Sequence, residues 1–476
     1  MAKIDKKSAS KALMKNTGII AIGQISTRLV NFFLLPLYTA LLTTEEYGTV
    51  DLLSTYSTLL CVLVGVQMSQ AVFRFLVTKR NDEKEKTAII STIVFATLGV
   101  FAVYTVVFLL ISPLLSVPFK WYLLLEVISS ITYQTVAGIS RGLGDNASYA
   151  LSSFISSTTV IVLNVLFIAV LRLGMAAMLA AYIIGPIIGT VVVLLRTNFR
   201  SCIRWSAKDI GLLKSIAAYC IPLVPNELSW SVIHSSDRWV ISAAISVAAN
   251  GLIAVASKFS VIYTTLFSIF NTSWTEQVVL HYKDEGGPEY INGMFEKMVT
   301  FFASIAIGII ACMPFVFGIL VNEKYFEAYG LIPWYLVAVF FNAVIGLISP
   351  IYLVNNETKH VAVSTMVAAI INLVVDILLV KTIGVYAAPI SSICGYLTIS
   401  IWRLIDVNKR HCRILLSLST TILLIVMLAV SMAAFYSGEI LFQIAALAFV
   451  AISALALNKS VIVEIIGNME RGKTST

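Results

Sequence analysis

Residues 17–42 read TGIIAIGQISTRLVNFFLLPLYTALL, an apolar run that carries a single charged residue, Arg28. A membrane-spanning helix needs about 20 apolar residues, so this run is long enough to cross a bilayer. It is too long for the apolar region of a signal peptide, and no cleavage site of small residues is recognisable after it. We therefore expect an uncleaved first transmembrane helix.

Runs of the same kind recur along the chain. Its 476 residues are 59% hydrophobic and only 12% charged, and soluble domains carry about 25% charged residues. This composition excludes a soluble globular protein and predicts an all-α polytopic membrane protein with about 14 transmembrane helices. The predicted spans are 16–42, 48–77, 87–112, 121–142, 148–171, 174–196, 212–236, 250–276, 294–320, 330–354, 360–380, 383–404, 414–436 and 439–458.

The distribution of basic residues predicts the orientation of these spans. In a soluble protein, the net charge of +8 would suggest binding to nucleic acid. In a membrane protein it reflects how basic residues are distributed between the two sides of the bilayer, so no nucleic-acid partner is expected. Most of the 33 Lys and Arg residues fall in the N-terminal segment, in alternate loops and in the C-terminal tail. The loops predicted on the opposite side hold only Lys120, Arg172, Arg238, Lys324 and Lys381. Both termini are therefore expected in the cytoplasm.

The two largest predicted cytoplasmic breaks divide the chain into three parts. The expected domains are an N-terminal six-helix bundle over 1–205, a C-terminal six-helix bundle over 206–405, and two additional helices with a cytoplasmic tail over 406–476. Because six is even, the two bundles enter the membrane in the same orientation. Any repeat that relates them has its axis along the membrane normal, as in some transporters.

No motif indicates an enzyme, a metal site or a bound cofactor. Residues 467–474 match the phosphate-binding loop pattern letter for letter, but that loop works only when a helix follows it and turns its amides toward phosphate. The four histidines are far apart, and the six cysteines form no CxxC pair. The sequence therefore predicts neither nucleotide hydrolysis nor metal chemistry.

Basic residues inside apolar runs are the first candidates for a functional site, because such charges are costly and face a partner or an aqueous cavity. Arg28, Arg74 and Lys258 are predicted to face a substrate path. The alternative for Arg28 is a buried ion pair, and Arg74 and Lys258 lie near enough to helix ends to snorkel to the interface. The adjacent Asp237 and Arg238 are expected to form an interfacial pair.

Acidic residues inside apolar runs are candidates for ion coupling. Glu126, Glu227 and Asp376 are predicted to bind H⁺ or Na⁺, because a desolvated carboxyl group exchanges protons near neutral pH. The alternative is that each is neutralised by one of the buried cations. Pro222 and Pro225 precede Glu227 and would allow a bend beside a cavity, or a kink that serves packing alone.

The N-terminal residues carry a resemblance to a known family. The stretch Gly18–Gln24, running into Arg28, together with 34–39 and 42–48, resembles the opening of the polysaccharide transporter proteins. These are Wzx-type flippases of lipid-linked oligosaccharides, in the superfamily that also holds the MATE exporters and the lipid II flippases. The helix count, the inside termini and the six-six-two division match that family.

The resemblance implies a flippase in the bacterial cytoplasmic membrane. It would move undecaprenyl-pyrophosphate-linked repeat units to the outer leaflet by alternating access, for O-antigen, capsule or exopolysaccharide synthesis. The implied partners are this anionic lipid-linked oligosaccharide, the lipid bilayer, a polysaccharide polymerase and a chain-length regulator. Arg28, Arg74 and Lys258 would line the groove between the halves, at positions where the family tends to be basic.

Two other functions compete with this interpretation. A MATE-like multidrug or cation antiporter would need an acidic, aromatic cavity. Arg28 argues against such a cavity, whereas the number of intramembrane acids is compatible with it. A membrane-embedded glycosyltransferase would need catalytic side chains in a substantial loop, and the predicted outer loops are short. We therefore expect a transporter and not an enzyme.

Overall fold

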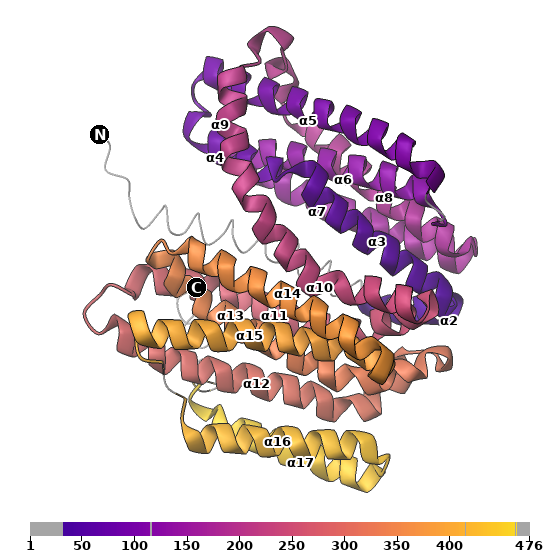
Figure 1. The fold of residues 1–476 in the computed structure, drawn as a ribbon, viewed down its shortest axis with the longest axis vertical. Helices are drawn as coiled ribbons and strands as arrows, with labels where there is room; N and C mark the ends of the chain where they lie inside the picture. The colour runs from indigo at the N-terminus through magenta and orange to yellow at the C-terminus, as the bar shows by residue number, and fades with distance from the viewer. Residues whose placement is uncertain (1–31, 115–116, 415, 462, 464–476) are drawn as a thin grey trace, which may run out of the picture. The chain divides into compact units, whose positions relative to one another are not determined.

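The computed structural model describes residues 32–114, 117–414, 416–461 and 463, and every regular element in this part of the chain is a helix (Figure 1). Most of the predicted first span, with Arg28, lies outside the described residues, as does the segment 467–474. Twelve segments of the described chain are long and apolar enough to cross a membrane, and one of them, Thr358–Arg410, contains two helices. The predicted all-α polytopic fold is confirmed.

The chain divides into two compact units, Met1–Ser235 and Ser236–Thr476, and the boundary falls inside α10. The expected division into 1–205, 206–405 and 406–476 rests on loop charges and stays a prediction. The helices of the first unit are α2 (Leu35–Leu41), α3 (Thr44–Gly65), α4 (Met68–Lys79), α5 (Glu83–Ile111), α6 (Lys120–Gly142), α7 (Asn146–Asn164), α8 (Gly174–Arg196), α9 (Ile210–Cys220) and the start of α10 (Val224–Ala244). Those of the second unit are the end of α10, α11 (Val247–His281), α12 (Gly287–Leu320), α13 (Ile332–Val354), α14 (Thr358–Ile383), α15 (Ala387–Arg410), α16 (Leu418–Ser437) and α17 (Ile440–Leu457).

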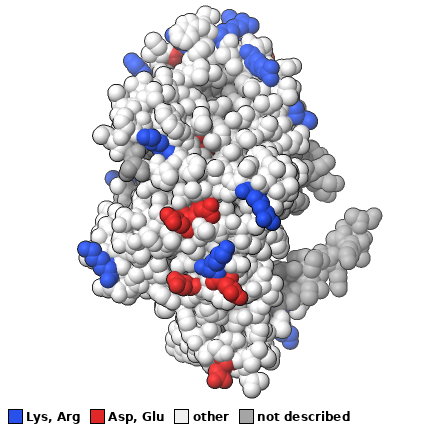
Figure 2. Space-filling view, turned by 90° about the vertical axis from the view of Figure 1, so that its right-hand side faces the viewer, with Lys and Arg blue, Asp and Glu red and all other residues white. Residues whose placement is uncertain are grey.

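Much of the described surface is apolar, as lipid contact requires. Side chains such as Leu110, Leu378 and Leu441 are between 67% and 79% exposed. Figure 2 shows that Lys, Arg, Asp and Glu cover only a small part of the face drawn there. Large exposed apolar areas would be unstable in water, and they are the expected surface of helices in a bilayer.

Two predicted spans are interrupted in the structure. The span expected over 48–77 is broken at Val66 and Gln67, which separate α3 from α4. The span expected over 212–236 is broken by a 3₁₀ turn, Ile221–Leu223, that contains Pro222. The second break follows from proline, which cannot donate a backbone hydrogen bond. The first has no proline or glycine at either broken position.

In the first unit, α4 lies in the core between α5, α6 and α9. Its buried Val72 and Leu76 belong to one apolar cluster with Ile93 of α5, Ile139 of α6 and Ile216 of α9. Small residues on α6 let the two backbones approach closely, as is common between membrane helices. A Cβ atom on Gly142 would lie 2.8 Å from the Cβ atom of Leu76.

In the second unit, α13 packs against α11 and α15, and α14 packs against α15. The indole N–H of Trp274 on α11 donates to the carbonyl of Leu347 on α13 at 2.9 Å, and both groups are buried. The last two helices, α16 and α17, lie along α12 (Figure 1). Met427 of α16 and Val450 of α17 pack there on Ile307 and Ala311 of α12.

The approach of α4 to α6 yields a stability prediction. Gly142→Val should lower the free energy of unfolding by about 1–3 kcal/mol, because the added carbon atoms collide with Leu76 in a packed core. Gly99→Ala on α5 is the matched control, since a Cβ atom there would meet nothing within 4 Å. Thermal unfolding of both purified variants measures the difference. Equal melting temperatures would contradict this account of the α4–α6 contact.

Candidate functional site

The three predicted substrate-facing cations are not described as one group. Arg28 lies outside the described residues, Arg74 lies on α4 in the first unit, and Lys258 lies half-buried on α11 in the second unit. Their joint role as a substrate site stays a prediction. The geometry around Arg74 is nevertheless informative, because α4 and α6 present polar side chains on neighbouring surfaces.

This surface, which we name the α4–α6 face, comprises the exposed residues Gln70 and Arg74 of α4 with Gln134 and Arg141 of α6. Gln70 and Arg74 are four residues apart, and Gln134 and Arg141 are seven apart, so each pair lies on one side of its helix. The two helices pack together. The sequence therefore collects two guanidinium groups and two amide groups over adjoining helices.

Arg141 borders a cavity of about 280 Å³ between α4, α6 and α7. Its guanidinium carbon lies 4.3 Å from the centre of the Phe73 ring and 5.8 Å from that of Tyr149. Rings at these distances hold the cation by its attraction to their faces and leave its N–H donors for another partner. The polar residues that line this cavity are Ser69, Gln70, Tyr133, Gln134, Arg141, Tyr149 and Ser153.

Arg74 is held in the same way. Its guanidinium carbon lies 4.4 Å from the centre of the Tyr219 ring on α9. Within the described residues, neither Arg74 nor Arg141 forms an ion pair. Arginine that is held by rings and lacks a carboxylate partner is suited to bind phosphate or another oxyanion in a bidentate manner.

Arg141 is a site residue that the sequence alone did not identify. It stands at the end of an apolar run, where a lone basic residue is equally typical of a cytoplasmic loop. Its spacing of seven residues from Gln134 was the one available signal. The contact with Phe73 and Tyr149 depends on the packing of three helices and cannot be derived from spacing.

The predicted coupling acids of the first unit lie apart from this face. The hydroxyl of Ser130 donates to Oε1 of Glu126 on α6 at 2.8 Å, whereas Oε2 is buried and has no hydrogen-bond partner among the described residues. Glu227 lies half-buried in the first turn of α10. No described cation pairs with either carboxyl group.

The second unit buries a polar cluster around Asp376 of α14. Asp376 is 0% exposed, and in the described structure neither of its carboxyl oxygens has a hydrogen-bond partner. One helical turn away, the Asn372 amide oxygen accepts a hydrogen bond from Ser236 at 2.8 Å. Carboxyl and amide oxygens of this kind are suited to bind a proton or a hard cation.

Asp237 and Arg238 belong to the same buried region and form the expected pair, whose place at the membrane interface stays a prediction. Asp237 is only 3% exposed and forms an ion pair with Arg238 at 2.8 Å. The hydroxyl of Tyr335 on α13 donates to Asp237 at 3.1 Å, and Arg238 donates to Ser257 on α11 at 3.1 Å. The pair is buried because these hydroxyl groups satisfy it inside the helix bundle.

An apolar groove of about 320 Å³ lies between α12, α13, α15 and α16. Its walls are almost entirely apolar, and its polar residues include Glu296 and Ser417. The Ser417 N–H donates to Glu296 at 3.0 Å, so this polar end is tied internally. Among the described residues that line this groove, Glu296 is the only charged one, and the apolar walls suit a hydrocarbon chain. Representative lining residues are Ala303, Ile307, Phe340, Val344, Ile401 and Leu424.

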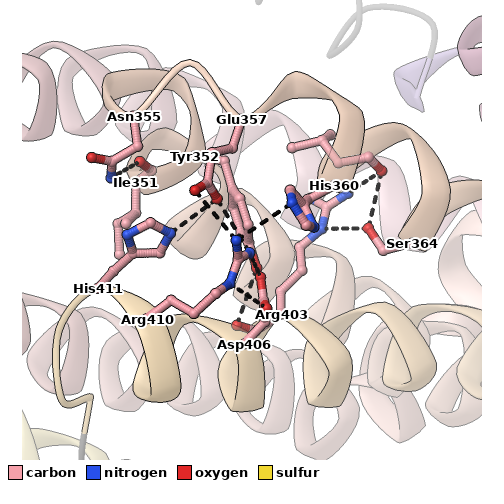
Figure 3. Close-up of polar contacts among 11 residues, drawn as sticks. Ile351, Tyr352, Asn355, Glu357, His360, Ser364, Arg403, Asp406, Arg410 and His411 are labelled. Atoms are coloured by element: carbon pink, nitrogen blue, oxygen red, sulfur yellow. Dashed lines mark hydrogen bonds and ion pairs between the residues drawn. The ribbon is translucent and has the colours of Figure 1, made fainter.

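Arg403 of α15 is a buried cation of a different kind (Figure 3). It is 1% exposed, and each of its three side-chain nitrogens donates a hydrogen bond to a protein acceptor. The acceptors are the hydroxyls of Ser349, Ser364 and Thr365 and the carbonyl of Val361, at 2.8–3.2 Å. Because four of its five N–H donors are occupied, Arg403 holds α13, α14 and α15 together and is not assigned to a substrate site.

Further along α15, an ion network closes the same end of the second unit (Figure 3). Arg410 pairs with Asp406 and with Glu357, and Glu357 also accepts from His411 at 3.0 Å. Tyr352 donates to Asp406 at 2.7 Å. Each acid here has a basic or hydroxyl partner, so the network ties α13 and the α13–α14 connection to α15.

A family model described as "Polysaccharide biosynthesis protein" matches residues 13–275. No curated protein matches the chain with significance. The structure of lipid II flippase MurJ in an inward closed conformation has a TM-score of 0.71 and 13% identity, covering 94% of this chain and 99% of that one.

Multidrug transporters have a related fold. An inward-facing multidrug resistance MATE transporter of the MOP superfamily has a TM-score of 0.62 and 14% identity, over 82% of this chain and 98% of that one. An outward-facing multidrug resistance MATE transporter of the MOP superfamily has a TM-score of 0.57 and 16% identity, over 84% of this chain and 95% of that one. These likenesses confirm the fold that the N-terminal resemblance implied.

The contrast between Arg403 and Arg410 gives a test of the structural role assigned here. Arg403→Leu should lower the free energy of unfolding by about 3 kcal/mol or more, because it orphans buried hydroxyl groups. Arg410 on the same helix is partly exposed and its ion pairs are screened by solvent, so Arg410→Leu should lower stability much less than Arg403→Leu. Thermal unfolding measures both. A larger loss for Arg410→Leu would show that the network and not Arg403 holds these helices.

Proposed function

The chain belongs to the polysaccharide biosynthesis protein family, and on this premise we propose that it is a flippase for undecaprenyl-pyrophosphate-linked oligosaccharides. Its cargo would be the repeat unit of a surface polysaccharide such as O-antigen, capsule or exopolysaccharide. It would move this unit across the bacterial cytoplasmic membrane by alternating access, with both termini in the cytoplasm. A polysaccharide polymerase and a chain-length regulator are its proposed partners.

The observation that carries the proposal is the α4–α6 face. Arg74 and Arg141 are exposed, are held by aromatic rings and have no carboxylate partner in the described structure. A diphosphate group offers several anionic oxygens, and guanidinium binds such oxygens in pairs. Arg28 and Lys258 are proposed to add positive charge to the same substrate path.

The apolar groove of the second unit supports a lipid-linked cargo. The groove has a volume of about 320 Å³ and apolar walls. Burial there is favourable for a prenyl chain and costly for a charged group or a sugar. We propose that part of the prenyl chain lies there during transport. A water-soluble cargo would leave this groove without a role.

Buried acids support ion coupling. Asp376, with Asn372 and Asp237 nearby in the same cluster, is proposed to bind H⁺ or Na⁺ in the course of the cycle, and Glu126 and Glu227 are further candidates. The same acids and the shared fold favour the alternative function, a MATE-like multidrug or cation antiporter. That function leaves the unpaired arginines of the α4–α6 face unexplained.

Export of surface glycan tests the role of the arginines. In cells that lack the native flippase, Arg74→Ala and Arg141→Ala should each lower export about tenfold, because each removes a charge-assisted contact with phosphate. Arg28→Ala should have a similar effect. Arg200→Ala changes an exposed residue of the turn Phe199–Cys202, which is not part of this face, and this control should export normally. Full export by the Arg74→Ala, Arg141→Ala double variant would overturn the assignment.

Transport by reconstituted protein tests the coupling role of Asp376. Asp376→Asn keeps the size of the side chain but removes its ability to bind a proton or to charge-compensate a cation, so an imposed H⁺ or Na⁺ gradient should no longer accelerate transport. Asp284→Asn in the exposed α11–α12 connection should keep the response. A gradient response that persists in Asp376→Asn would assign coupling to another group.

A further inference from the structure

The junction between α3 and α4 is unusual for a helix inside a membrane. Val66 has φ 43° and Gln67 has φ 56°, so two consecutive residues that are not glycine adopt the left-handed conformation. This conformation is unfavourable for L-residues and most of all for a β-branched one. Strained backbone of this kind is retained where it serves a site.

The break creates a new helix N-terminus at α4, a helix of 12 residues. Gln67 stands at the N-cap and makes no capping hydrogen bond with its side chain. Its carbonyl accepts from the amides of Gln70 and Ala71 at 3.0 and 3.3 Å. The amides of Met68 and Ser69 come before these first hydrogen bonds, so they belong to the set of helix donors that need a partner from outside the helix.

A small cavity lies at this junction. Its volume is about 20 Å³, and Gly65, Gln67, Met68, Ser69, Gln134 and Thr135 are among its lining residues. A cavity needs about 10–15 Å³ to hold one water molecule, so this one has room for a single oxygen-sized group. Thr135 is 4% exposed, and its buried hydroxyl has no hydrogen-bond partner in the described structure. This hydroxyl is therefore available to bond a water molecule or a ligand oxygen in the cavity.

The small cavity adjoins the larger one of the α4–α6 face, because Ser69 and Gln134 line both. The larger cavity has about 280 Å³ and is bordered by Arg141. An anion in the larger cavity would therefore lie between the guanidinium of Arg141 and the first turn of α4. Amide groups at a helix N-terminus bind phosphate oxygens well.

We propose that the α3–α4 break is a diphosphate subsite. One phosphate oxygen occupies the small cavity and accepts hydrogen bonds from the Ser69 amide and the Thr135 hydroxyl, while the rest of the diphosphate lies in the larger cavity beside Arg141. The inference rests on the proposed function and deepens it, since it names backbone donors for the head group. It also gives the strained residues Val66 and Gln67 a role, which is to expose those donors within the membrane span.

A pair of substitutions at one position isolates the backbone donor. Ser69→Pro removes the amide hydrogen in the first turn of α4 without loss of an intrahelical hydrogen bond, and Ser69→Ala keeps this hydrogen and removes only the side-chain hydroxyl. Each full-length variant in lipid nanodiscs is titrated with undecaprenyl diphosphate, and with undecaprenol as the phosphate-free lipid. Ser69→Pro should bind undecaprenyl diphosphate about tenfold more weakly, and Ser69→Ala within about twofold of the parent protein.

Thr135→Val is the second variant, because Ser69→Pro could also disturb packing. Position 69 lies close to Gly138, where an added Cβ atom would be 3.1 Å from the Ser69 carbonyl oxygen. Valine has the shape of threonine without the hydroxyl, so this variant should bind about fivefold more weakly and unfold at an unchanged temperature. Inorganic pyrophosphate should compete with the lipid in the parent protein and lose this ability in Ser69→Pro. Absence of competition would overturn a site that recognises the diphosphate.

The outcomes separate this inference from the proposed function. If Ser69→Pro and Thr135→Val bind as the parent does while Arg141→Ala binds weakly, the break holds only water and the subsite is overturned, but the flippase stands. If the parent protein binds undecaprenyl diphosphate no better than undecaprenol, the proposed function and the subsite both fail.

Discussion

Charge and free backbone groups are costly in hydrocarbon, and this constraint governs which residues of the protein matter. A polar group inside the helix bundles must either find a partner within the protein or wait for one from outside. Arg403 illustrates the first solution, since hydroxyls and a carbonyl take up its donors. Arg74 and Arg141 are instead exposed at the surface of the first unit, where aromatic rings hold them and no described acid neutralises them.

The two units meet this constraint with different chemistry. The first unit gathers cations, amides and aromatic rings over α4 and α6, which suits an anionic head group. The second unit buries Asp237, Arg238 and Asp376 and also contains the apolar groove between α12, α13, α15 and α16. A lipid-linked diphosphate with ion-coupled transport uses all three features, whereas a soluble cationic cargo would use only the acids.

The sequence predicted the fold well, because apolar runs of bilayer length define helices without knowledge of their partners. Spans such as 439–458 agree with α17 to within a few residues. The break at Val66 and Gln67 was not predictable, because neither residue is a helix breaker. The candidate site was predictable only in part. Arg74 and Asp376 stood out as charges in apolar runs, but the position of Arg141 over Phe73, and the burial of Asp237, depend on packing between distant segments.

The most direct test of the central claim is a transport measurement with purified protein in liposomes. Two fluorescent cargoes share one oligosaccharide and one prenyl chain and differ only in the linkage, a diphosphate in the first and a neutral ether in the second. If the arginines of the α4–α6 face bind the diphosphate, the protein moves the diphosphate-linked cargo between leaflets and does not move the neutral one. Equal movement of both cargoes would contradict recognition of the diphosphate. Transport of a cationic drug, with no movement of either cargo, would contradict it as well.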